Sequence, residues 1–463
     1  MNIRFVTSNE FKLEEIKTIL NEKNLNVLPV NIKIEELQTD DNLKLIKDKT
    51  IKAFKEVGRP LFVEHTGFYL EYISGLPGGL SEIFWLKLGP KVFTELFGNN
   101  SNNKAVVKTI IGYCDGYKIY TFESKVFGKI SSKPYGFSKF EWDQIFIPYG
   151  YNKTVAEMGE EKNKVSSKRK ALNKFVNFLK NNNKIFKKRD YSFINNLCES
   201  IINKNVVLFV GAGVSNNLHL PSWEPLLESM GKDLGYDEEI FKTLGGNLTL
   251  AEYYKNKKHG ISEVRNLLLK DEENIKEEIA KSDIHKLIVE LDFPLIYTTN
   301  YDRCLETAFD YYNKKYILIK TVEDLINLDN TITQIIKFHG DLNDENSVVL
   351  TESSYFQRLN FESPLDIKLR ADMLGKSILF IGYGFNDINI RYLLYKLNKI
   401  WTNSSSPYAK PKSYMFLTKP NPVQEEILEA RGIIPIVSTS DNPGEGLKDF
   451  LKLLKEKIIK LKN

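Results

Sequence analysis

Short apolar runs recur along the chain, and their length is that of buried β-strands rather than of membrane-spanning helices. In the first part, helical periodicity marks residues 43–57 and 167–179, and residues 12–20 form a further amphipathic stretch. The polar stretch NNSNN at 99–103 predicts a loop between a helix and a β-hairpin. The strand-like runs are residues 3–6, 60–63, 105–113, 117–127 and 144–147. Strands and helices mixed in this order predict an α/β or α+β domain.

The second part has a more regular pattern. A helix is expected near residues 193–203, and the fully apolar run 206–210 follows it. Similar short runs, separated by helical segments, lie at 294–297, 334–338, 377–381 and 413–417. Buried apolar strands that alternate with helices predict a parallel, doubly wound, Rossmann-like sheet.

Between the two parts the chain reads KNNNKIFKKRD, a polar and basic stretch with little to bury. We interpret it as a solvated linker, although a basic run also suits contact with nucleic acid. The expected organisation is therefore a first domain at residues 1–180, a linker at 181–190 and a second domain at 191–463.

Composition narrows the class of protein. Of the 463 residues, 42% are hydrophobic, which is too many for a disordered chain, and the net charge of +5 is too small to indicate nucleic acid. No apolar run reaches the roughly 18 residues that span a bilayer, and residues 1–10 lack a signal-peptide core. Three scattered cysteines, Cys114, Cys198 and Cys304, make neither a disulfide framework nor a four-thiolate zinc site. We expect a soluble, cytoplasmic protein without a membrane partner, and we disfavour nucleic acid as a ligand.

Candidate chemistry in the second domain begins with Gly211-Ala212-Gly213, which follows a predicted strand and precedes a helix. Glycines there let the backbone approach a diphosphate, although a tight structural turn explains them equally well. Asn300 and Asp302 (in TTNYD) follow another strand, and His339 (in FHGD) follows a third. Ligands of open α/β sheets bind at such strand ends, although a single histidine is more often structural.

The ordered motifs GAGVS, TTNYD and FHGD, followed by the glycine turn GYGFND, resemble those of the sirtuin superfamily. The resemblance implies NAD binding and a catalytic role for Asn300, Asp302 and His339. The implied NAD-binding residues are Gly211, Ala212, Gly213, Ser215, Thr299, Gly382, Gly384, Asn386 and Asp387.

Two departures refine this resemblance. Residues 340–382 contain no cysteine, so the zinc ribbon of protein-deacylating sirtuins is absent, and Ser222-Trp223 stands near the position of their PDFR stretch. Both departures resemble sirtuin-like NAD hydrolases of bacterial defence, with NAD as the substrate. Departure of nicotinamide builds oxocarbenium character at the ribose C1′, so Asn300 is expected to position water and His339 to manage a proton.

The first domain opens with Thr7-Ser8-Asn9 before a helix that carries Lys12, which suits either a phosphate cradle or an ordinary capped helix. With VEHTG, GLPGG, FEWD and EKNKVSSK, it resembles the inosine triphosphate pyrophosphatase family, whose members remove pyrophosphate from non-standard purine triphosphates. The implied nucleotide-binding residues are Thr7, Asn9, Lys12, Lys49, Phe140, Trp142, Asp143, Lys162, Ser166 and Lys168. The implied Mg²⁺ ligands are Glu15, Glu36 and Glu64, and the alternative for Phe140 and Trp142 is a role as core aromatics.

Here too the departures are informative. His65 stands where the family has its catalytic aspartate, and an imidazole is neither a hard oxygen ligand nor a charged base at pH 7. The family's SHR triplet is Ser166-Ser167-Lys168 in this chain. The pocket keeps the residues implied to contact phosphate and to stack on the purine, but it loses the catalytic base. We therefore expect it to bind a nucleotide without hydrolysing it efficiently, so its pyrophosphatase activity is doubtful.

Together the halves predict an NAD hydrolase that is switched on by ITP or dITP, through rearrangement of a homo-oligomer. By resemblance, this implies antiphage defence by abortive infection, with separate defence proteins that make the signal. The alternative is a house-cleaning pyrophosphatase of ITP, dITP or XTP with an accessory NAD-binding domain. An effector triggered by nucleic acid is not supported, because the sequence has no basic patch interleaved with aromatic residues. A protein deacylase is disfavoured, because the zinc-binding cysteines are missing.

Overall fold

The computed structural model divides the chain into two compact units, Met1–Arg189 and Asp190–Asn463, described in turn below. It describes residues 2–138, 142–182, 192–218, 220, 223–262, 264–266, 275–326, 328–359, 362–384, 387–404 and 410–462. Most of the predicted linker at 181–190 lies outside these residues, so its bounds stay a prediction.

The N-terminal unit is built on a mixed seven-stranded sheet of order β2-β1-β3-β5-β6-β7, with β4 paired to β3. β1 runs parallel to β2 and β3, whereas β3, β5, β6 and β7 pair antiparallel. The strands are β1 Asn2–Val6, β2 Asn26–Val30, β3 Leu61–Leu70, β4 Pro77–Gly78, β5 Lys104–Cys114, β6 Ile119–Ile130 and β7 Phe146–Pro148. The mixed α/β fold predicted for this half is confirmed, and residues 99–103 do connect a helix to the β5–β6 hairpin.

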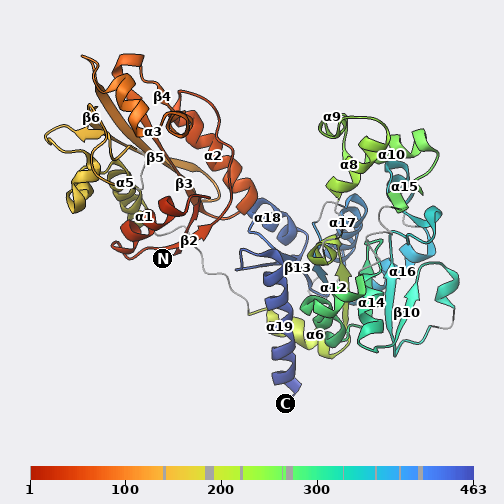
Figure 1. The fold of residues 1–463 in the computed structure, drawn as a ribbon. Helices are drawn as coiled ribbons and strands as arrows, with labels where there is room; N and C mark the ends of the chain where they lie inside the picture. The colour runs from red at the N-terminus through yellow and green to blue at the C-terminus, as the bar shows by residue number, and fades with distance from the viewer. Residues whose placement is uncertain are drawn as a thin grey trace. The chain divides into compact units, whose positions relative to one another are not determined.

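Helices cover both faces of this sheet (Figure 1). α1 and α5 pack on one face through Ile16, Leu172 and Phe175, and α2 packs on the other through Ile46 and Ala53. The helices are α1 Glu10–Asn21, α2 Asn42–Val57, α3 Ser81–Phe97, α4 Lys162–Val165 and α5 Ser167–Asn181. Because α1, α2 and α5 carry predicted nucleotide-binding residues and β3 carries a predicted Mg²⁺ ligand, the packing of these elements determines the geometry of the first site.

The C-terminal unit has a seven-stranded, wholly parallel sheet of order β10-β11-β9-β8-β12-β13-β14. This confirms the predicted Rossmann-like sheet. The strands are β8 Val206–Val210, β9 Leu295–Thr298, β10 Tyr316–Ile319, β11 Thr333–Lys337, β12 Ser377–Ile381, β13 Ser413–Leu417 and β14 Ile433–Val437. The chain places β9, β10 and β11 on one side of β8, then crosses to build β12, β13 and β14 on the other. The topological switch point therefore lies between β8 and β12.

Two helical layers enclose this sheet. α6, α13, α14 and α19 pack on one face, and α16, α17 and α18 pack on the other. The long α19 also contacts α6, the first helix of the unit: the Cys198 Sγ–H donates to the Leu454 carbonyl (3.9 Å) and the Lys457 ammonium donates to Asn195 Oδ1 (3.0 Å). The helices are α6 Ile194–Ile202, α7 Ala212–Ser215, α12 Ile275–Lys281, α13 Asp283–Leu291, α14 Cys304–Tyr311, α16 Pro364–Gly375, α17 Ile388–Thr402, α18 Pro422–Ala430 and α19 Pro443–Lys462.

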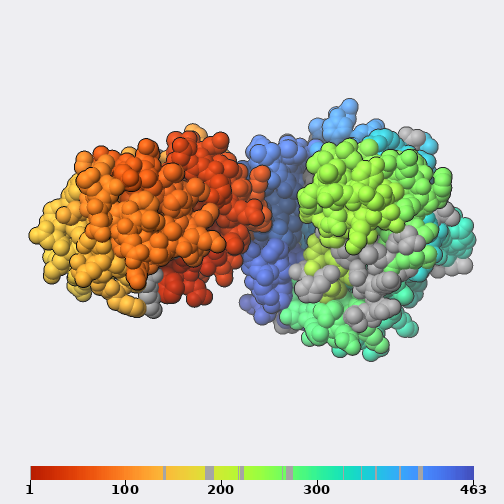
Figure 2. Space-filling model, turned by 45° about the horizontal axis from the view of Figure 1, so that its top comes forward, coloured from red at the N-terminus to blue at the C-terminus, as the bar shows by residue number. Residues whose placement is uncertain are grey.

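A smaller helical lobe stands beside this sheet, with its own apolar cluster around Met230, Phe241 and Tyr254. It contains α8 Trp223–Asp233, α9 Glu238–Thr243 and α10 Asn247–Lys258, and α10 contacts α15 Glu352–Gln357. The space-filling view shows α8 to α10 as one mass of side chains, in green (Figure 2). Among the described residues, no helix is both long and apolar enough to cross a membrane.

Candidate functional site

The glycine turn after β8 lies against the turn after β12, at the switch point of the parallel sheet. The Gly211 N–H donates to the Ile381 carbonyl (3.0 Å), and the Gly213 N–H donates to the Gly382 carbonyl (2.8 Å). A Cβ added to Gly211 would lie 2.5 Å from the Gly382 oxygen, and one added to Gly213 would lie 2.9 Å from it. The two turns can therefore approach each other only because these residues are glycines. The tight structural turn left open above is real, and diphosphate binding by the same turn stays a prediction.

Asn300 is held at the carboxyl end of β9 by a short chain of hydrogen bonds. The Thr298 hydroxyl donates to the Val210 carbonyl (3.1 Å) and accepts from the Asn300 N–H (3.0 Å). The Asn300 side-chain amide donates to the Ser215 hydroxyl (3.0 Å). Both side chains are buried, so the structure brings two predicted site residues from β9 and the glycine turn into direct contact.

His339 follows β11 and is 2% exposed. Its Nε2 lies 3.2 Å from Asp387 Oδ2, without the alignment of a hydrogen bond. Burial, with the positive charge of Arg358 acting in the same direction, lowers the pKa of His339 to about 3. Burial raises the pKa of the Asp387 carboxyl, whose Oδ1 also caps α17 by accepting from the Ile390 N–H (3.0 Å). At neutral pH the imidazole is therefore uncharged and able to accept a proton.

Other predicted NAD-site residues occupy the same turns with different roles. Asp302 Oδ1 accepts from the N–H of Cys304, the first residue of α14 (3.0 Å). Ala212, Thr299 and Gly384 lie on the turns after β8, β9 and β12. Asn386 and Ser222 fall outside the described residues, as does the side chain of Trp223.

Sequence reasoning missed three side chains around this centre. Arg358 stacks on Phe338, with its guanidinium carbon 3.9 Å from the ring centroid, and donates to the Phe338 carbonyl. The ring of Tyr355 meets the imidazole of His339 edge to face at 5.3 Å. The third is Lys337, at the end of a strand that carries no other charge. The sequence alone could have pointed to Lys337, because a lysine at the end of a buried strand is unusual. It could not have pointed to Tyr355 and Arg358, because no motif marks the helical segment that carries them.

In the N-terminal unit, each carboxylate predicted to hold Mg²⁺ is paired with a lysine predicted to bind the nucleotide. Lys12 Nζ lies 3.5 Å from Glu64 Oε2, and Lys49 Nζ lies 2.5 Å from Glu36 Oε1. The third pair joins Lys168 on α5 to Glu15 on α1. Within the described part of the chain, no three His, Cys, Asp or Glu side chains are grouped closely enough to hold a metal ion. The carboxylates are suitable Mg²⁺ ligands by chemistry, and Mg²⁺ on a triphosphate needs only one or two of them, so this ligand set stays a prediction.

His65 lies in the middle of β3, opposite Ile110 of β5, and its Nδ1 is 3.1 Å from Glu36 Oε2. The adjacent Glu64 is 2% exposed. Burial alone would raise the pKa of Glu64, but Lys12 and Lys168 hold it at about 2. The pKa of Glu36 is also lowered: the His65 and Lys49 contacts outweigh burial. Both carboxylates therefore stay charged at neutral pH, and the ammonium groups of Lys12 and Lys49 balance their charge.

The remaining nucleotide residues divide into helix caps and pocket groups. The Asn9 side chain caps α1 by accepting from the Lys12 N–H (3.0 Å), and Ser166 caps α5, so a capping role applies to both. Thr7 Oγ1 accepts from the Asn9 N–H (3.1 Å). Lys162 begins α4.

The base-side residues lie at the far end of the same sheet. Trp142 stacks near Phe68, with ring centroids 6.1 Å apart, in the core beneath α3, as expected of a core aromatic. Asp143 Oδ2 accepts from the Ser138 hydroxyl (2.9 Å), and burial raises the pKa of this carboxyl. Phe140 lies outside the described residues.

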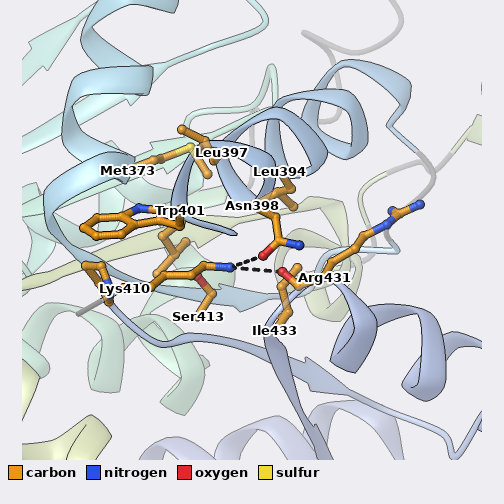
Figure 3. Close-up of a pocket in the computed structure, with 11 residues that line it drawn as sticks. Met373, Leu394, Leu397, Asn398, Trp401, Lys410, Ser413, Arg431 and Ile433 are labelled. Carbon is orange, nitrogen blue, oxygen red and sulfur yellow. Dashed lines mark hydrogen bonds between the residues drawn. The ribbon is translucent and has the colours of Figure 1, made fainter. Parts of the chain in front are cut away.

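A pocket of the C-terminal unit lies at the opposite edge of the sheet from the glycine turns, at the amino ends of β12, β13 and β14 (Figure 3). Lys410 donates to Asn398 Oδ1 (2.7 Å) and to the Arg431 carbonyl (3.2 Å) in this pocket, and Trp401 forms one wall. None of the predicted site residues lines it.

The folds define an α/β protein with a mixed-sheet N-terminal unit and a Rossmann-like C-terminal unit. Residues 3–178 match the Ham1 family, and residues 294–436 match a SIR2-like domain. A dITP/XTP pyrophosphatase of Thermococcus kodakarensis is 34% identical over 183 residues, which are 39% of this chain and 99% of that protein. Through its N-terminal unit the chain belongs to the Ham1 family, and its C-terminal unit contains a SIR2-like domain.

Two further comparisons cover parts of the molecule. An NAD(+) hydrolase, ThsA of Enterococcus faecium, is 31% identical over 218 residues, which are 46% of this chain and 44% of that protein. The chain therefore spans less than half the length of that relative. The solved structure of a HAM1 protein from Coxiella burnetii aligns with 39% of this chain and 99% of that chain, at 21% identity and a TM-score of 0.36.

Proposed function

We propose that the C-terminal unit hydrolyses NAD⁺ to nicotinamide and ADP-ribose, and that a non-standard purine triphosphate bound by the N-terminal unit switches this activity on. The observation that carries the proposal is the buried centre at the switch point. There an uncharged His339 lies beside Asp387, and the Asn300 amide is held by Ser215. The SIR2-like match and the ThsA relative support NAD⁺ as the substrate.

The reaction breaks the bond between the ribose C1′ and the nicotinamide nitrogen, and its electron pair leaves with nicotinamide. Positive charge develops at C1′, and a water oxygen then bonds to that carbon and loses a proton. Asn300 is suited to orient the water or the ribose, because its amide has a fixed direction. His339 is neutral at pH 7, because burial lowers its pKa, and its Nε2 lies 3.2 Å from Asp387 Oδ2, so the proton of the attacking water can pass to this pair of side chains.

The N-terminal unit supplies a site for a polyanion rather than an efficient hydrolase. Lys12 on α1 and Lys168 on α5 come from one face of the sheet, and Lys49 on α2 comes from the other. A triphosphate can replace the carboxylates that these three lysines contact. His65 occupies the position of the family's catalytic carboxylate and contacts Glu36. A bound nucleotide is therefore retained as a signal, and ITP or dITP are the ligands we propose.

Switching requires the nucleotide to bind the active and resting states with different affinities. We propose rearrangement of a homo-oligomer as the coupling step and depletion of cytoplasmic NAD as its outcome. In a bacterial cell under phage attack this is abortive infection, with the nucleotide made by separate defence proteins.

One experiment tests the proposal directly. The full chain is incubated with NAD⁺, alone and with ATP, dATP, ITP or dITP, while released nicotinamide and pyrophosphate are measured together. Nicotinamide release that depends on an inosine nucleotide is the expected result. Its absence with every nucleotide rejects the proposal.

A second candidate is nucleotide sanitation, with the C-terminal unit as an accessory NAD-binding module. It is favoured by the 34% identity to a dITP/XTP pyrophosphatase, which this chain covers to 99%. In the same assay, pyrophosphate release from dITP without loss of NAD⁺ identifies this candidate.

A further inference from the structure

Lys337 is a fully buried lysine at the end of β11, two residues before His339. The rest of the strand, Thr333 to Ile336, is buried and carries no charge. Removing an ammonium group from water is costly unless other groups replace its hydration. The contacts of this side chain therefore show what the charge does.

The ammonium group contacts the turn that carries Asn300. It donates to the carbonyl of Tyr301 (3.0 Å) and to that of Asp302, the two residues that follow Asn300. It also lies 3.2 Å from Glu306 Oε1 on α14 and 3.8 Å from Asp341 Oδ2. One side chain thus connects the strand that leads to His339 with the turn that leads from Asn300.

We propose that Lys337 is a positioning residue of the NAD site, which fixes Asn300 relative to His339. Its effect on turnover rests on the proposed function, whereas its effect on the turn does not. A simpler role is neutralisation of Glu306, which is 1% exposed and whose pKa burial raises against the influence of Lys337. Neutralisation of Glu306 explains only one of the four contacts of the Lys337 ammonium. Two of the other three are to the uncharged carbonyls of Tyr301 and Asp302.

The test uses Lys337→Met in the full chain, with Lys320→Met as the matched control. Lys320 lies at the same 3.8 Å from Asp341 Oδ2, and none of its recorded contacts reaches the Asn300 turn. Two amides report on that turn by hydrogen exchange: Asn300 N–H, bonded to Thr298, and Cys304 N–H, bonded to Asp302. We expect faster exchange of both in Lys337→Met and not in Lys320→Met. Exchange that matches wild type overturns the proposal, whether or not the chain hydrolyses NAD⁺.

A second variant separates positioning from charge neutralisation. Lys337→Met combined with Glu306→Gln removes both charges of the pair, so it is expected to recover thermal stability lost in the single variant. We expect kcat for nicotinamide release to stay about 100-fold below wild type in both variants, with KM little changed, because a displaced catalytic group loses rate more than affinity. Recovery of kcat in the double variant overturns the positioning role. If wild type releases no nicotinamide with any nucleotide, the proposed function fails, and the exchange result still decides the role of Lys337.

Discussion

The two candidate sites balance charge in opposite ways. In the N-terminal unit, three lysines face three carboxylates, and the pKa values of Glu36 and Glu64 are lowered, so the site keeps full charges in pairs. In the C-terminal unit, burial lowers the pKa of His339 and raises that of Asp387, so charge is disfavoured on both. The first arrangement suits exchange of partners with a polyanion, and the second suits a reaction in which charge appears only in the transition state.

The positions of the two sites in their sheets differ as well. His65 and Glu64 lie in the middle of β3, where pairing with β5 fixes each backbone position. Asn300, His339 and Gly382 follow the ends of parallel strands, where turns can move without breaking the sheet. The positions of the side chains on β3 therefore change only when a residue is substituted. The side chains on the turns of the second site can also move when the conformation changes.

The largest expected effect concerns the C-terminal site. His339→Ala and Asn300→Ala should each lower nicotinamide release at least about 100-fold, since a general base or a water-orienting group is lost. His285→Ala is the matched control, because His285 is also fully buried but contacts only Ser282 among the hydrogen bonds recorded for its ring. Activity per folded molecule should be unchanged in the control. Equal loss in all three variants would show a general loss of structure.

The next effect concerns the N-terminal site. His65→Asp places a second carboxylate beside Glu64 on β3, and we expect pyrophosphate release from dITP to rise about 100-fold, the scale of an added general base. His65→Asn, which has a similar size and no basic group, should remain as slow as the native chain. A pyrophosphate assay with both variants decides. Fast hydrolysis by the native chain would remove the contrast between a binding site and a catalytic one.

The folding stability of the two units should fall at different pH values on acidification. Burial lowers the pKa of His285 to about 4, below its ordinary 6.5, so the unfolded chain takes up that proton first. The C-terminal unit therefore loses stability as pH falls from 6.5 toward 4, by about 3 kcal/mol from His285 alone, since one pKa unit is about 1.4 kcal/mol. His339 acts in the same direction, down to about pH 3.

In the N-terminal unit the corresponding loss begins lower. The pKa of Glu64 is about 2 against 4.5 when unfolded, so its contribution is complete above pH 4.5 and is lost below it. Pulse proteolysis in urea near pH 7 and near pH 5, with the surviving fragments identified, should show weakening of the C-terminal unit only. Replacing His285 by Gln should reduce that weakening, and an unchanged pH dependence would contradict the assignment.

The smallest effect expected here is on nucleotide affinity. Lys168→Met should weaken binding of dITP about ten-fold, because one charged contact to the triphosphate is lost. Lys174→Met on the same helix is the control, since the Lys174 ammonium is on the surface and donates to the Glu123 carbonyl (2.6 Å). Titration calorimetry measures both. Equal affinities for the two variants would place the triphosphate away from Lys168.

Hydrophobic patterning predicted the central strands of both sheets but missed edge strands. β2 and β14 contain Pro29 and Pro435, and proline within a run argues against a central strand. Both lie at an edge of their sheet, where a strand tolerates a residue that cannot donate a hydrogen bond. β3 was expected to end at residue 63, but it continues to Leu70 because Glu64, His65 and Thr66 are buried polar residues that break the apolar pattern.

For the sites, ordered motifs located the right strand ends but could not give the partners of each side chain. That Asn300 meets Ser215, and His339 meets Asp387, depends on the order of strands in the sheet. Likewise, pairing of Glu15 with Lys168 joins residues 153 positions apart. The contact between Asp302 and the first N–H of α14 could not be predicted either, because the residue at the N-cap position is Arg303.

The packing of α19 on α6 makes the fold of the C-terminal unit independent of the segment before it. These helices are the last and first of the C-terminal unit, and they are held together by the Lys457–Asn195 and Cys198–Leu454 contacts. The first and last helices of the unit are thus joined, and among the described residues every strand of the parallel sheet comes from this unit. The C-terminal unit should therefore keep its fold when the segment before α6 is exchanged, because α6 stays attached to α19.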